Sequence, residues 1–144
     1  MFIVEYDSAF AFGVMLFELP SEENDFARYV EAIPKLDSRA AGRDAPVLVV
    51  EFAEGYPAPS AVWRKRFVEA RVKLASSPLV ALVAPSVAMR AGIALARWIR
   101  PPQFEQRVFS TFDEAMEWTE EKRGGTTKIL HRLYLEAKQR AGRP

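Results

Sequence analysis

Two short apolar runs constrain the fold of this chain more than any other feature. They are PVLVVEF at residues 46–52 and LVALVA at residues 79–84. Neither run alternates between apolar and polar residues, which is typical of strands buried on both faces of a parallel sheet. The segment between them, from Ser60 to about Ala75, has the periodicity of an amphipathic helix. The apolar face of that helix consists of Trp63, Phe67, Ala70 and Leu74. A strand, a helix and a second strand in this order predict parallel neighbouring strands.

The residues before the first run predict a hairpin and a helix. FIVEY (2–6) and FAFGVMLFEL (10–19) have the composition of strands, and the three residues between them suit a tight turn. Residues 20–36 then carry a helical pattern, with Ser21 placed to cap its amino end and Pro34 placed to end or kink it. The apolar face of this helix is expected to comprise Phe26, Tyr29, Val30 and Ile33.

Residues 85–99 predict another helix after the second apolar run. Ser86 is the expected N-cap, and the Pro101-Pro102 pair is expected to stop the helix. Five residues at helical spacing are expected to face inward, namely Val87, Ala91, Ala94, Leu95 and Trp98.

The remaining residues predict a strand and two helices. QRVFS (106–110) is the strand, and residues 111–123 follow as a helix whose Thr111 and Glu114 form a capping box. After a Gly-Gly pair, residues 126–140 form an amphipathic helix. Its apolar stripe is Ile129, Leu130, Leu133, Tyr134 and Ala137. This stripe must be covered, either by its own domain or across a homodimer interface.

These elements predict a single domain of the α/β class. The expected architecture is a mixed, mostly parallel central sheet with an N-terminal β-hairpin, covered by helices. Residues 1–123 form the body, and residues 124–144 form an amphipathic, basic helical appendage. The chain of 144 residues is long enough to bury a core of ordinary size, and its composition of 49% hydrophobic and 27% charged residues fits a globular protein.

Residues suited to catalysis or metal binding are few. The chain has no cysteine and one histidine, His131, so thiolate and histidine metal sites are not expected. Glycine-rich phosphate loops and the Gly-x-Ser-x-Gly motif are absent from the sequence. Acid pairs such as Glu120 and Glu121 lie in acid-rich helical stretches, which is typical of solvated helix faces. We therefore expect no enzyme activity, no metal and no cofactor.

Charge is distributed unevenly along the chain, whose net charge is +1. Residues 1–31 carry seven acids and one base, whereas residues 122–144 carry seven bases and one acid. The ends can be two solvated surfaces, or the basic end can meet an anionic partner. Nucleic acid is not expected, because the basic end has few aromatics and no compact Lys/Arg run. No apolar run approaches the roughly 20 residues that span a bilayer. The first residues lack the pattern of a secretory signal, so a cytoplasmic location is expected.

Two loops follow the apolar strands, where open α/β sheets place their binding sites. Each brings a serine, Ser60 or Ser86, to a helix N-terminus, where it can cap the helix or help to hold an anion. The loop at residues 54–60 is long and stiffened by prolines, and its Tyr56 is expected to be exposed. The predicted binding residues are Tyr56, Ser60, Arg64, Lys65 and Ser86.

The segment RVFSTFDEAMEW (107–118), together with the order of the elements, resembles the closing strand and helix of the SpoIIAA-like, or STAS-like, family. The resemblance covers about residues 1–123. It implies a regulatory module, because the family includes anti-sigma-factor antagonists that are phosphorylated on a serine after the third strand. That position falls in the loop that contains Ser60, but the family's Asp followed by Ser-Ser or Ser-Gly is missing from residues 51–55. This favours Ser60 as an N-cap over Ser60 as a phosphorylation site.

The leading hypothesis is a non-catalytic regulatory module that recognises a protein partner through the loop and helix start after the third strand. The alternative is a small apolar or lipid-like ligand held in a groove between sheet and helices. The residues expected to line that groove are Met15, Phe17, Trp63 and Met89.

Overall fold

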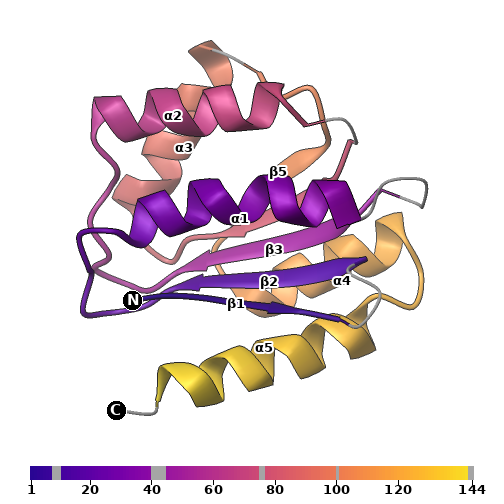
Figure 1. The fold of residues 1–144 in the computed structure, drawn as a ribbon. Coiled ribbons are helices and arrows are strands. Elements are labelled where there is room, and N and C mark those ends of the chain that lie inside the picture. Colours follow the sequence, from indigo (N-terminus) through magenta and orange to yellow (C-terminus); the bar gives the residue numbers. More distant parts are fainter. Residues whose placement is uncertain (8–10, 40–44, 75–76, 100, 143–144) are drawn as a thin grey trace.

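The computed structural model (Figure 1) describes residues 1–7, 11–39, 45–74, 77–99 and 101–142. Its elements are β1 (Phe2–Tyr6), β2 (Phe12–Phe17), α1 (Asp25–Arg39), β3 (Val47–Phe52), α2 (Ala61–Val72), β4 (Leu79–Val83), α3 (Val87–Ile99), β5 (Gln106–Phe109), α4 (Phe112–Lys122) and α5 (Thr127–Ala141). Their types and order agree with the sequence prediction. The turn residues Ser8 and Ala9 and the predicted helix end at Ala75 lie outside the described residues.

The five strands form one sheet whose spatial order follows the sequence, β1-β2-β3-β4-β5. β1 pairs antiparallel with β2, and the other neighbouring strands pair in parallel. The predicted α/β class, with its N-terminal hairpin and mostly parallel sheet, is thus confirmed. Each right-handed crossover advances one strand in the same direction, so α1, α2 and α3 all lie on one face of the sheet (Figure 1). α4 and α5 cover the opposite face.

Side chains that alternate along the strands build a core on each face of the sheet. In β2, Val14 and Leu16 point toward α4 and α5, whereas Met15 and Phe17 point toward the face of α1, α2 and α3. The residues of β3 and β4 divide between the two cores in the same way. Burial of each such side chain stabilises the fold by roughly 1.5–3 kcal/mol. Covering both faces explains why the two apolar runs show no polar alternation.

The C-terminal helix α5 belongs to the same core as the sheet. Leu130, Leu133 and Ala137 are at most 1% exposed and pack with residues of β1 and β2. The ring of Tyr134 stacks on Phe112 of α4, with 3.8 Å between ring centroids. The apolar stripe is therefore covered by its own domain, which is one of the two predicted alternatives.

A carboxylate from α4 holds the amino end of α5. The Glu120 side chain accepts hydrogen bonds from the backbone N–H groups of Gly125, Thr126 and Thr127 at 2.8–3.0 Å, and from both threonine hydroxyls. The N-cap residue Thr126 makes no side-chain cap hydrogen bond itself. The backbone N–H groups of Gly125 and Thr127 lower the pKa of Glu120 to about 2. Glu120 thus supplies the acceptor and the negative charge that a helix N-terminus favours.

Replacing Glu120 by Gln is expected to lower the melting temperature, because the amide lacks the charge that the N–H groups and the helix dipole stabilise. The pKa of Glu120 is depressed from 4.5 to about 2, so its contribution is complete above about pH 4.5 and is lost as the pH falls toward 2. Thermal melts at several pH values should show the E120Q difference shrinking in acid. Glu121→Gln, one residue along, provides the control. A pH-independent difference would contradict this role.

Helix α1 begins and ends later than its sequence pattern predicts. Ser21 is not its N-cap, because residues 22–25 form a turn in which the Asp25 N–H donates to the Glu22 carbonyl oxygen. The helix then continues through Pro34 to Arg39. Pro34 is exposed, so water can reach the carbonyl that loses its partner at the proline. The prediction that Pro34 ends the helix is therefore wrong.

Candidate interaction surface

The loop after β3 is closed over the core, and its tyrosine is not exposed. Tyr56 is 5% exposed and packs against the rings of Phe17 and Phe26. Gly55, at φ +81°, allows the chain to turn back, and the Tyr56 N–H donates to the Ala53 carbonyl oxygen. The prediction of an exposed Tyr56 is wrong because its ring completes the aromatic cluster between the sheet and α1. A partner cannot contact this side chain directly.

The Tyr56 hydroxyl is held by a buried carboxylate at the start of α1. It donates to Asp25 Oδ2 at 2.5 Å, and the same oxygen accepts from the Met1 amine at 2.7 Å and the Glu22 N–H at 2.9 Å. The Asp25 side chain is 0% exposed. Burial acts to raise the pKa of Asp25, but the hydrogen bonds from the amine, Tyr56 and Glu22 outweigh it and lower the pKa. Asp25 therefore stays charged and ties three segments together.

Both predicted serines are N-caps. Ser60 accepts from the Trp63 N–H at 3.4 Å, and Ser86 accepts from the Met89 N–H at 3.3 Å. Arg64 folds back to donate to the Pro59 carbonyl oxygen at 2.9 Å. Ser60, Arg64 and Lys65 are exposed, whereas Ser86 is half-buried. Of the five predicted binding residues, only these three exposed ones lie together at the start of α2.

A polar cluster that the sequence analysis missed joins α5 to the carboxyl ends of β2 and β3. Lys138 Nζ lies 2.5 Å from Glu18 Oε1 and 3.3 Å from Glu51 Oε2, and the Tyr134 hydroxyl donates to Glu51 Oε2 at 3.1 Å. Glu51 is the only charged residue in the first apolar run. A charge in a buried strand requires a partner, so its position was a usable signal.

The chemistry of this cluster favours anchoring over proton transfer. Burial and the Glu51 charge raise the pKa of Tyr134 to about 12. Burial acts to lower the pKa of Lys138, but the carboxylates of Glu18 and Glu51 outweigh it and raise the pKa. Both groups therefore keep their protons at neutral pH, and neither is poised as a base or nucleophile. The cluster fixes α5 on the sheet.

The most unusual surface of the molecule is the outer face of α3. Val87, Leu95 and Trp98 are 72%, 58% and 83% exposed, and Ala91 and Ala94 are exposed between them. These five residues, called the α3 stripe below, were predicted to face inward, and that prediction is wrong. A helix that is apolar around its circumference is normally covered on every side.

The orientation of α3 has a local cause. The Arg90 guanidinium donates to the carbonyl oxygens of Ala84 and Pro85 at 2.7 and 2.8 Å, which fixes the rotation of the first turn. Met89 is 6% exposed, and the half-buried Ile93 packs against the core on this face of the sheet. Because both faces of α3 are apolar, hydrophobic periodicity alone selected the wrong one.

The helices α2 and α3 are rich in basic residues. α2 and α3 cover the same face of the sheet (Figure 1) and together carry six bases and one acid, Glu69. Two further apolar side chains of α2 are open to solvent, Val62 at 60% and Val72 at 44% exposed. This part of the surface therefore combines apolar side chains with positive charge.

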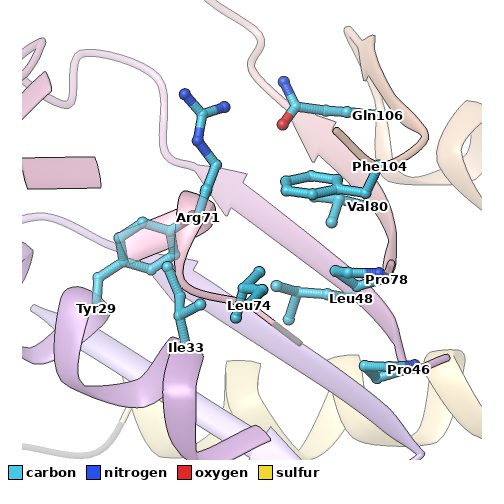
Figure 2. Close-up of a pocket in the computed structure, with 10 residues that line it drawn as sticks. All are labelled: Tyr29, Ile33, Pro46, Leu48, Arg71, Leu74, Pro78, Val80, Phe104 and Gln106. Atoms are coloured by element: carbon cyan, nitrogen blue, oxygen red, sulfur yellow. The ribbon is translucent and has the colours of Figure 1, made fainter. Parts of the chain in front are cut away.

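The cavity beneath the end of α2 is small. A cavity of about 30 Å³ lies between α1, the end of α2 and the strands β3 and β4 (Figure 2). That volume holds one or two water molecules. Tyr29, Leu48 and Leu74 are among its lining residues, whereas none of the four residues expected to line a ligand groove reaches it. A lipid-like ligand would require these side chains to move apart.

Comparison with known proteins gives no relative: no known family, curated protein or solved structure matches the chain. Among the described residues, no cluster of His, Asp and Glu side chains could hold a metal ion. Within those same residues, no helix has the length and apolarity to cross a membrane.

Proposed function

We propose that this protein is a non-catalytic interaction module that binds a protein partner through the α3 stripe. The observation that carries the proposal is the exposure of Val87, Leu95 and Trp98 on one face of a single helix. Large aromatic and aliphatic side chains of this kind form the energetic centres of protein interfaces when a partner buries them. An open patch of contiguous apolar residues is typical of such an interface.

The charge around the stripe supports an acidic partner. In a symmetric dimer the same surface would meet itself, and the bases of α2 and α3 would face their own copies. Like charges placed opposite one another across an interface cost several kcal/mol. An acidic, partly apolar protein surface would instead pair with Arg97, which neighbours Trp98 in the last turn of α3.

We also retain the loop and helix start after β3 as a part of the proposed partner site. Ser60, Arg64 and Lys65 stay available to a partner, while Tyr56 supports the loop from inside. We further propose that the module is a STAS-like regulatory protein of the cytoplasm. Phosphorylation of Ser60 stays a prediction of that resemblance.

Photo-crosslinking tests the proposal. A photoreactive residue at Trp98 is expected to crosslink a protein in native lysate that a photoreactive residue at Leu135 does not. Leu135 is a suitable control because it is 48% exposed but lies on α5, on the opposite face of the sheet. The crosslinked protein should then be purified and titrated against the intact chain.

The titration is expected to show at least tenfold weaker binding for Leu95→Ser or Trp98→Ser and little change for Leu135→Ser. Binding should also weaken as the salt concentration rises. Sedimentation of the protein alone tests whether a second copy of the chain, and not an acidic partner, covers the α3 stripe. A dimer that Trp98→Ser dissociates would contradict the acidic partner and assign the stripe to a second copy.

A further inference from the structure

The free edge of β1 has backbone groups arranged to accept another strand. β1 lies at one edge of the sheet, and β2 is its single strand partner among the residues that the structure describes. In this pair the Glu18 N–H donates to the Met1 carbonyl oxygen and the Asp7 N–H donates to the Phe12 carbonyl oxygen. Odd-numbered residues of β1 therefore face β2, and the N–H and C=O groups of Phe2, Val4 and Tyr6 point away from the sheet.

A groove runs along this edge, between β1 and α1. Its volume is about 310 Å³, close to the lower limit of ligand-binding clefts. The side chains of the same three residues of β1 line one wall. Residues one helical turn apart on α1 line the other wall, including Arg28, Glu31 and Lys35. The groove thus combines a strand edge, apolar and aromatic side chains, and a wall with two bases and one acid.

We propose that this groove binds an extended acidic peptide by strand addition to β1. The outward backbone groups of β1 define the chemistry of the occupant, because only a main chain in extended conformation matches their spacing. Alternate side chains of the added strand would enter the groove, where an acidic side chain meets Arg28. Arg28 also lies 5.6 Å from the centroid of the Phe2 ring, at the wall of the groove. This site lies on β1, at the other end of the sheet from the strands that flank α3, and is independent of the α3 stripe.

Arg140 of α5 controls access to this edge. Its guanidinium donates to the Val4 carbonyl oxygen at 3.0 Å and to the Glu5 carboxylate at 2.5 Å. An added strand needs the same Val4 oxygen as an acceptor. Arg140 therefore competes with an added strand for that oxygen, and its presence protects the edge from unselective pairing.

Hydrogen exchange with a defined probe tests the proposal. The probe is a short acetylated and amidated peptide of alternating valine and glutamate. Two control peptides have the same side chains but carry N-methyl groups on every second residue, one on the odd and one on the even positions. In one of the two, the backbone N–H donors that would face β1 are removed. Hydrogen exchange at the amides of Phe2, Val4 and Tyr6 is first measured by NMR in the free protein. The probe should slow it at least tenfold, whereas the control peptide that lacks those donors should not.

Protein variants separate the contributions of charge and backbone. Arg28→Glu is expected to weaken binding of the probe about fivefold or more, while Arg132→Glu, an exposed change on α5, should leave it unchanged. Arg140→Ala is expected to tighten binding, because it frees the Val4 oxygen. Absence of probe binding, or binding without protection of the three amides, would overturn strand addition. Equal binding of a valine–lysine peptide would overturn the preference for acidic partners.

Discussion

A chain truncated after Gly124 is expected to lose its cooperative fold. Truncation removes Leu130, Leu133 and Ala137, which are at most 1% exposed, and uncovers the core residues of β1 and β2 beneath them. Replacing one fully buried leucine by alanine typically costs about 2–5 kcal/mol, and a small domain has only about 5–15 kcal/mol of stability in total. Circular dichroism and size-exclusion chromatography should show an expanded or aggregated chain without a sharp melting transition.

Two point substitutions in α5 test the same contribution to stability on a smaller scale. Leu133→Ala is expected to lower the free energy of unfolding by about 2–5 kcal/mol in urea denaturation. Leu135→Ala, two residues along the same helix, should change it by only about 0.5 kcal/mol, because Leu135 is 48% exposed. A folded, monomeric truncated chain with unchanged stability would restore the view of α5 as an appendage.

Replacing Asp25 by Asn is expected to lower the free energy of unfolding by about 2–3 kcal/mol. The substitution keeps the shape of the side chain but removes the charge that the Met1 amine and the Tyr56 hydroxyl contact at 2.7 and 2.5 Å. The estimate lies below that for a fully buried ion pair because Met1 is 27% exposed. Glu23→Gln, an exposed neighbour, should change stability by only about 0.5 kcal/mol.

The loss of unfolding free energy caused by Asp25→Asn should become smaller as the pH falls. The pKa of Asp25 is lowered from 3.8 in the folded protein, so its contribution is complete above about pH 4 and is lost as the pH falls through the folded-state pKa. The difference between wild type and variant should therefore narrow in acid. Tyr56→Phe should cost about 1–2 kcal/mol, and its effect should largely disappear in the Asp25→Asn background. Additive effects would contradict a shared network.

The fold was predictable where one pattern allowed one structure. The runs at residues 46–52 and 79–84 can be buried only between two layers of helices, and the stripe of α5 has a single apolar face. The site was harder to predict because it depends on contacts between distant residues. The hydroxyl of the buried Tyr56 donates a hydrogen bond to Asp25, which is 31 residues away in the sequence. The charge of Glu51 is paired with that of Lys138. The prediction of the inward face of α3 was wrong for another reason. The helix has two apolar faces, so the apolar pattern does not determine its rotation, and the hydrogen bonds of Arg90 hold its first turn instead.

The position of α5 in the sequence also determines when, during synthesis, the apolar face of β1 and β2 becomes covered and protected from aggregation. α1, α2 and α3 can each settle on strands that have just left the ribosome, since the sheet grows in the order of translation. The opposite face of β1 and β2 is covered only when α5 has been made. Until then the nascent protein exposes Ile3, Val14 and Leu16. Synthesis of α5 is therefore the step that removes this apolar surface from water.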